Sequence, residues 1–169
     1  MTMHHVLLAA LLAASNPAAP AQAPQTAAEA AMKAYWDRLP NQLRTSESAR
    51  ERALGARFKA PEDPVGTGKA LREAAQAAPT DALVQMIWAT VGDRWSGCAA
   101  IESCPEQSLA WSRVEPDNGL AWVPVFEAMG KKGDARSIDA DIARMAAARY
   151  YDDHYIDYWM AWRKAISTG

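Results

Sequence analysis

The stretch from Pro116 to Asp134 constrains the fold of this chain more than any other segment. Its proline is expected to end one helix, Trp122 falls early on the next helix, and Gly133 begins a turn into a third. The pattern Pro-x-x-x-Leu that opens this stretch also stands at Pro79, 37 residues earlier. Recurrent junctions of this kind indicate helical hairpins that pack on one another, because a single hairpin buries only part of its apolar surface.

The rest of the chain also favours helix. Alanine, leucine, arginine and glutamate dominate, and β-branched residues are too scattered for strands of period two. Thr26 and Glu29 match a capping box that opens a helix, and Pro40 is expected to end it. Residues 61–68 are rich in proline and glycine and are expected to form a loop at an internal boundary. The expected helices span residues 27–39, 46–58, 69–78, 81–91, 105–114, 119–130, 134–148 and 152–167.

The later junction resembles the tetratricopeptide repeat, a helical hairpin of about 34 residues. Pro116 stands where that family has its closing proline, and Trp122 stands where it has a large residue on the first helix. Phe126 and Ile138 depart from the family pattern, which usually has small residues at those positions. The resemblance covers residues 69–150 and implies an all-α, short solenoid of stacked helical hairpins that binds other proteins. An irregular helical bundle with two similar turns is the alternative.

The amino-terminal segment predicts export. Residues 6–14 form an unbroken apolar run, which is too short for a membrane-spanning helix of about 20 residues. An Ala-x-Ala site follows at 21–23, so residues 1–23 are expected to be a cleaved secretory signal, with a disordered tail as the alternative. The mature protein is then expected in the periplasm or outside the cell, free of the membrane. A helical pair at 24–60 and the repeat region at 69–169 would complete the chain.

Two cysteines, Cys98 and Cys104, lie close together in the sequence. In an exported chain such a pair favours one structural disulfide bond, and two free thiols are the alternative. A metal site would need more thiol or imidazole ligands than this neighbourhood contains. No metal or other cofactor is therefore expected.

The charge distribution argues against a nucleic-acid partner. The chain has 18 basic and 20 acidic side chains, for a net charge of −2. Residues 24–59 carry a net charge of +3, and residues 60–169 carry −5. Proteins that bind nucleic acid through its phosphates need a concentrated basic surface, which this distribution does not supply.

The segment from residue 150 to residue 162 concentrates aromatic and acidic side chains and is the candidate partner-binding surface. Its aromatic residues recur at helical spacing, which would place them on one face. His154 is expected to point away from the acids at 153 and 157, because adjacent helical residues diverge by about 100°. Packing of the aromatics in the core is the alternative. The candidate partner-binding residues are Tyr151, Asp153, Tyr155, Asp157, Tyr158 and Trp162.

No motif in the sequence indicates catalysis. Neither Gly-x-Ser-x-Gly nor His-Glu-x-x-His occurs. We therefore expect a non-catalytic module that binds a protein partner, either an envelope assembly or a toxin that it neutralises. A small envelope hydrolase with paired carboxylates and a purely structural domain are the alternatives. Trp122 and Trp159 are expected to pack inside the domain.

Overall fold

The computed structural model describes residues 26–95, 105–132 and 135–168. Within these ranges every regular element is a helix, so the all-α class predicted from the sequence is confirmed. The expected signal, Cys98, Cys104 and the Gly133 turn lie outside the described residues. The elements are α1 (Ala27–Arg44), α2 (Ala49–Lys59), α3 (Pro64–Ala77), α4 (Ala82–Trp95), α5 (Pro105–Ser108), α6 (Ala110–Val114), the 3-10 helix η2 (Gly119–Trp122), α7 (Val123–Lys132), α8 (Ala135–Ala146) and α9 (Tyr155–Thr168).

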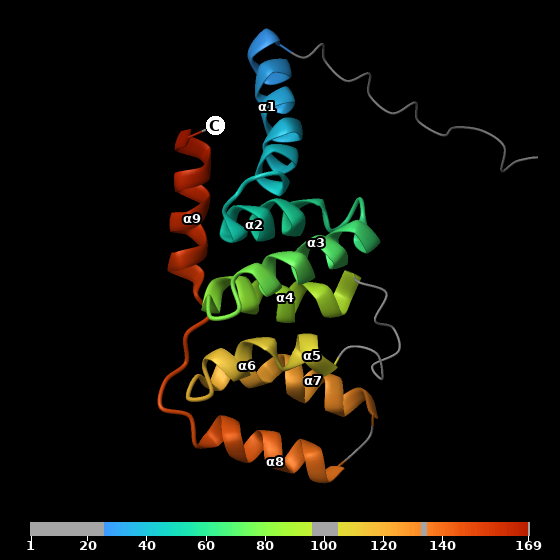
Figure 1. Ribbon diagram of the computed structural model, residues 1–169, viewed down its shortest axis with the longest axis vertical. Helices are drawn as coiled ribbons and strands as arrows, with labels where there is room; N and C mark the ends of the chain where they lie inside the picture. Colours follow the sequence, from blue (N-terminus) through green and yellow to red (C-terminus); the bar gives the residue numbers. More distant parts are fainter. Residues whose placement is uncertain (1–25, 96–104, 133–134, 169) are drawn as a thin grey trace, which may run out of the picture.

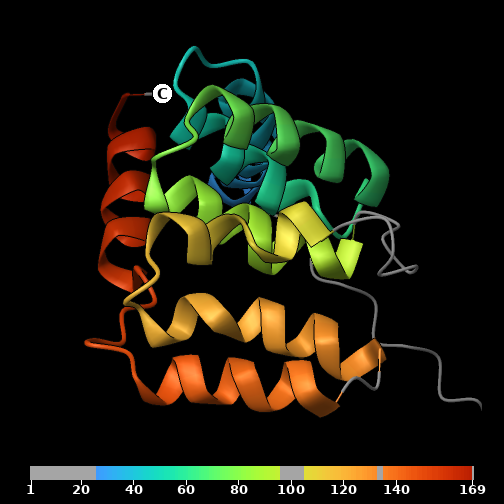
Figure 2. The ribbon, with the colours of Figure 1, turned by 60° about the horizontal axis from the view of Figure 1, so that its bottom comes forward.

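The helices stack in chain order from α1 to α8, and α9 returns along one side of the stack (Figure 1). Consecutive helices pack directly on one another from α1 to α4, and α7 packs on α8. Figure 2 shows α9 crossing the edge of the stack at a steep angle to the other helices. Among the described residues, no helix combines the length and the apolar character that a membrane crossing requires.

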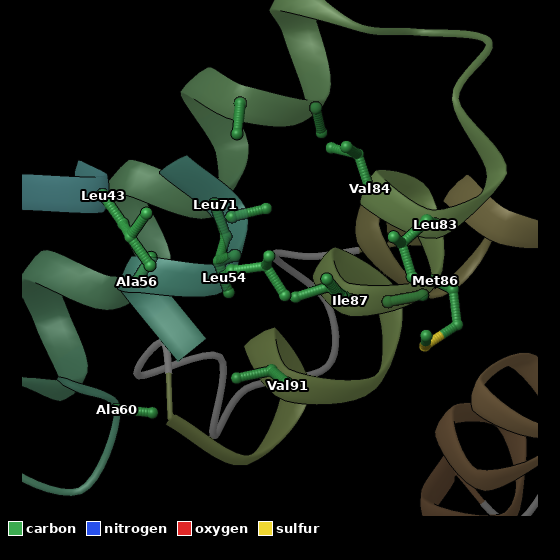
Figure 3. Close-up of a cluster of buried hydrophobic side chains, with 14 of the residues drawn as sticks. Leu43, Leu54, Ala56, Ala60, Leu71, Leu83, Val84, Met86, Ile87 and Val91 are labelled. Atoms are coloured by element: carbon green, nitrogen blue, oxygen red, sulfur yellow. The ribbon is translucent and has the colours of Figure 1, made fainter. Parts of the chain in front are cut away.

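The hydrophobic core lies between α2, α3 and α4. Leu54, Leu71 and Ile87, one from each of these helices, are fully buried, and Figure 3 shows Leu54 pointing toward Ile87 beside Leu71. Burying each such side chain contributes about 1.5–3 kcal/mol. Trp111 and Trp162 belong to the same cluster. The core is therefore continuous across residues 61–68.

Two helix boundaries predicted from prolines were wrong. Helix α1 continues through Pro40 to Arg44, although an interior proline typically costs about 3 kcal/mol. Pro40 is itself buried, and a Cβ on Gly55 of α2 would lie only 2.7 Å from its carbonyl oxygen, so the two helices meet closely there. This packing offsets the lost backbone hydrogen bond.

The second wrong boundary is the start of α3. This helix begins at Pro64, where the missing amide hydrogen costs nothing because first-turn amides have no partner within a helix. The Asp63 carboxylate accepts a hydrogen bond from the Gly66 amide at 2.9 Å and caps the helix. The hydroxyl of Thr67, which is fully buried, donates to the Ala56 carbonyl at 3.2 Å. The glycines expected in a loop therefore lie within a helix.

Candidate functional site

The chain between α8 and α9 is fixed to the turn that precedes η2. The Gly119 amide donates to the Tyr150 carbonyl at 2.9 Å. The side chain of Asn118, which is fully buried, donates to the Asp152 carbonyl at 2.7 Å and accepts from the Asp152 amide at 3.1 Å. One asparagine thus satisfies both backbone groups of a residue 34 positions away. These contacts set the path by which the chain returns to the edge of the stack.

Tyr151 covers this turn. Its ring lies against Gly119, where a Cβ atom would overlap it. Its hydroxyl donates to the Met145 carbonyl near the end of α8 at 2.5 Å. A glycine is therefore needed at position 119 for close approach of the aromatic ring.

His154 lies directly before α9 and is buried, in a left-handed backbone conformation with φ of 53°. Its Nε2 atom lies 2.7 Å from Oε2 of Glu115, and its Nδ1 atom lies 3.2 Å from Oδ2 of Asp157. The expectation that His154 points away from the neighbouring acids was wrong, because α9 begins at Tyr155 rather than at residue 152. The unusual backbone turns the imidazole inward.

Glu115 is the centre of this arrangement. Its Oε2 atom accepts hydrogen bonds from Trp111 Nε1 at 2.7 Å, Asn118 Nδ2 at 3.0 Å and His154 Nε2 at 2.7 Å. We call Trp111, Glu115, Asn118, His154 and Asp157 the His154 cluster. The cluster joins α6, the turn before η2 and the start of α9.

The hydrogen bonds of the cluster favour the charged forms of Glu115 and His154. Burial alone raises the pKa of Glu115, but the hydrogen bonds from His154, Asn118 and Trp111 outweigh it, so the pKa is lowered. Burial alone lowers the pKa of His154, but the bonds to Glu115 and Asp157 outweigh it, so the pKa is raised. Both ring nitrogens can donate to carboxylates only in the imidazolium form. The arrangement therefore acts as an ionic clamp on the start of α9.

The six residues predicted to bind a partner do not form one surface in the structure. Trp162 is 4% exposed and belongs to the core, so it is not on the surface. Tyr158 is half-buried beneath the Arg57 guanidinium, 4.8 Å from its ring centre. Asp157 belongs to the His154 cluster, and Asp153 caps α9 through the Tyr155 amide at 3.0 Å. The predicted single aromatic face does not form, because Tyr151 lies outside the helix.

A different face of α9 is exposed. We define the α9 outer face as Tyr155, Ile156, Trp159 and Met160, which are 59%, 71%, 53% and 57% exposed. Of these, only Tyr155 is among the residues predicted to bind a partner. The prediction that Trp159 packs inside the domain was wrong. The spacing of these residues is the signal that would have found the face, since 155 and 159, and likewise 156 and 160, are four positions apart and lie close together on a helix.

Aromatic contacts connect α9 to the amino-terminal helices. Trp162 packs edge-on against Phe58 of α2, with ring centres 5.1 Å apart, and Phe58 stacks on Trp36 of α1 at 6.4 Å. The Tyr35 hydroxyl also reaches the Ile166 carbonyl, at 3.4 Å. Aromatic pairs contribute about 0.5–1.5 kcal/mol beyond their buried area. Helix α9 is therefore held by the His154 cluster at its start and by α1 and α2 along its length.

A pocket of about 260 Å³ opens beside the His154 cluster. Its apolar wall includes Met86 of α4, Trp111 of α6, Leu120 of η2 and Val123 of α7. Two exposed carboxylates, Glu127 and Asp153, also line it. In the described ranges, no group of three or more histidine, cysteine, aspartate or glutamate residues is arranged to hold a metal ion.

Comparison with protein-family models, with curated proteins and with solved structures finds no match to this chain. The fold and the candidate site allow only a structural description of the protein. The chain is an all-α stack of helices whose last helix is clamped to the edge and presents an apolar face to solvent.

Proposed function

We propose that this chain is an exported, non-catalytic protein-interaction module that binds a protein partner through the α9 outer face. The observation that carries the proposal is the exposure of four adjacent large apolar side chains on one helix. A contiguous apolar surface of this kind commonly marks a site of association. Tryptophan, tyrosine and methionine are also enriched in protein interfaces.

The way α9 is held supports the same proposal. His154 fixes the start of the helix, and Trp162 and Ala165 anchor its inner side in the core. A surface on a helix that is already fixed loses little conformational freedom on binding, so more of the contact energy appears as affinity. An apolar face on a freely moving segment would have to be ordered by the partner.

The charges beside this face indicate the chemistry of the partner. Asp152, Asp153 and Asp157 stand at the amino-terminal end of α9, and all three are exposed. We infer a partner whose apolar patch is flanked by basic side chains, since complementary charges orient and accelerate association. A basic toxin that the chain neutralises and an envelope assembly with a basic rim both meet this requirement. The periplasm or the cell exterior is the compartment that we propose.

The stacking of the helices is consistent with a repeat origin. Helix α4 packs on α5 and α6, and α7 packs on α8. We infer that these two groups are the tetratricopeptide-like hairpins. In this proposal α9 covers the edge of the stack and displays the binding surface on its outer side.

The acids of the His154 cluster are engaged in holding the fold. A hydrolase with paired carboxylates would need one carboxyl group that keeps its proton near neutral pH. Glu115 has a lowered pKa and accepts three hydrogen bonds through one oxygen. A Glu115 side chain that stays charged can hold the start of α9 in place, but it does not supply the protonated carboxyl group that such a hydrolase needs. This observation supports binding over catalysis as the function.

The test is affinity capture of the full chain, tagged after its last residue, from the cells that produce it. The comparison variant is Ile156→Asp with Trp159→Ala, which removes the apolar character of the outer face. The matched control is Val65→Ser on α3, because Val65 is 77% exposed and lies outside this face. Each protein is checked for folding by circular dichroism before use.

The proposal predicts one protein that the wild type and the Val65→Ser control capture in a fixed ratio and that the α9 variant loses. Equal capture by all three proteins would contradict the proposal, because binding would then not use this face. The proposal also fails if the folded wild type captures nothing above the background of an untagged strain.

A further inference from the structure

The pocket beside the His154 cluster is large enough to hold part of a small molecule. Its volume of about 260 Å³ is close to the lower end of the range for such sites, which is about 300–1,000 Å³. Its wall is built from four separate elements, with Met86, Trp111, Leu120 and Val123 as the apolar surface. Trp111 is 3% exposed and is held in place by its bond to Glu115, so this part of the wall is fixed.

Two carboxylates from different elements line the same pocket. Glu127 projects from α7, and Asp153 belongs to the chain segment that enters α9. Asp153 uses its Oδ1 atom to cap α9, and a carboxylate has capacity for further donors at its second oxygen. No basic residue lines this pocket, whose lining lies wholly within the described ranges. The pocket therefore combines an apolar wall with negative charge.

These two properties select the class of ligand. An anion would be repelled by Glu127 and Asp153, and a polar neutral molecule would gain little from the apolar wall. A small organic cation satisfies both surfaces, because its apolar body can cover the wall while its charge meets the carboxylates. We propose that this pocket binds a small molecule that carries a primary ammonium group on an apolar body. The site is separate from the α9 outer face and does not depend on the function proposed for that face.

The Trp111 indole reports on this site. It lines the pocket and donates its Nε1 hydrogen to Glu115 at 2.7 Å, so a bound ligand changes the environment of that hydrogen. The experiment uses the full chain with ¹⁵N-labelled tryptophan and follows the Trp111 indole signal by NMR, assigned with a Trp111→Phe variant. The probes are phenethylammonium and its neutral analogue 2-phenylethanol, which share the same apolar body and differ in charge.

The variants remove the charge of each pocket carboxylate while keeping a side chain of similar size. Glu127→Gln removes one carboxylate, and Asp153→Asn removes the other while keeping a side chain that caps helices well. Glu73→Gln on α3 is the matched control, because it removes an exposed carboxylate that does not line the pocket. The comparison of the two probes on the wild type needs no variant and holds even if a substitution prevents folding.

We expect the Trp111 signal to shift saturably with phenethylammonium. Binding should weaken by about threefold to tenfold for 2-phenylethanol and for each pocket variant, since a solvent-exposed ion pair contributes at most on the order of 1 kcal/mol. The Glu73→Gln control should bind as the wild type does. The proposal is overturned if the alcohol binds as tightly as the ammonium ion, if the control weakens binding as much as the pocket variants do, or if no saturable shift occurs.

Discussion

Nε2 of His154 lies 2.7 Å from Oε2 of Glu115, and this contact joins two residues that are 39 positions apart in the chain. Both side chains are largely shielded from solvent, with 7% and 15% of their surfaces exposed. The contact helps to hold the start of α9, and the packing of Trp162 against Phe58 holds its inner side. The orientation of the proposed binding surface therefore depends in part on an ionic contact at the base of the helix.

The stability of the protein should depend on pH through this contact. The pKa of His154 is raised above its ordinary value of 6.5, so the imidazolium contributes stability fully below about pH 6.5. That contribution is lost as the pH rises through the raised pKa of the folded state. The lowered pKa of Glu115 acts in the opposite sense, because its contribution is lost only when the pH falls below its ordinary value of 4.5.

The variant that isolates this effect is His154→Asn, because asparagine tolerates the left-handed backbone better than most residues. We expect the variant to be less stable than the wild type near pH 6, and the difference in free energy of unfolding to shrink toward pH 9. Urea titrations at several pH values measure it. A difference that stays constant or grows with pH would contradict the prediction.

The titratable or charged groups around His154 are Glu115, Tyr150, Asp152, Asp157 and, facing Asp157, Arg50.

Asn118 should be among the most sensitive polar positions in the chain. Replacing it with alanine removes both bonds to the Asp152 backbone and the bond to Glu115, and it leaves buried polar groups without partners. We expect Asn118→Ala to lower the free energy of unfolding by about 2–3 kcal/mol. Asn41→Ala on the exposed side of α1 is the control and should change it by less than about 0.5 kcal/mol. Similar losses in the two variants, measured in urea, would show that Asn118 does not hold the return segment.

Gly119 and Tyr151 should be energetically coupled. A methyl group at position 119 overlaps the Tyr151 ring, so Gly119→Ala should destabilise the protein by about 1–3 kcal/mol. In a Tyr151→Ala background the same change should cost much less, because the ring that it displaces is gone. A double-mutant cycle in urea measures this coupling. An equal cost in both backgrounds would mean that the ring does not cover the glycine.

The two tryptophans of α9 that differ in exposure should respond differently to truncation. Trp162 is 4% exposed, and Trp162→Ala should cost about 3–5 kcal/mol of stability. Trp159 is 53% exposed, and Trp159→Ala should cost less than about 1 kcal/mol. Thermal denaturation of both variants provides the comparison. A larger loss for Trp159 than for Trp162 would reverse the assignment of the inner and outer faces.

Local sequence signals predicted the elements of this fold well. The capping box was confirmed, since the Thr26 amide donates to Glu29 at 2.7 Å and the Glu29 amide donates to the Thr26 hydroxyl at 3.2 Å.

Where tertiary packing outweighs a local rule, the predictions from sequence were wrong. Pro40 continues α1 because it is buried against α2. Trp122, expected inside, is half-buried and lies beneath the Arg144 guanidinium at 5.0 Å.

The sequence predicted only part of the candidate functional site. The segment was chosen for its aromatic and acidic residues, but both sides of α9 are apolar, so periodicity does not show which side faces the core. Ile156 and Met160 occupy one side, while Trp162 and Ala165 occupy the other. The inner side is selected by contacts with distant residues, such as that of His154 with Glu115 and that of Trp162 with Phe58. Such a distant contact leaves no signal in a single sequence.

The most direct test of the proposed function is site-specific photocrosslinking in the cells that produce the protein. A photoreactive amino acid replaces Trp159 on the α9 outer face in one strain and Val65 on α3 in another, both at exposed positions. We expect one dominant crosslinked protein from position 159 that is missing from position 65. The same products from both positions, or no product from position 159 in folded protein, would contradict the claim that the α9 outer face binds a partner.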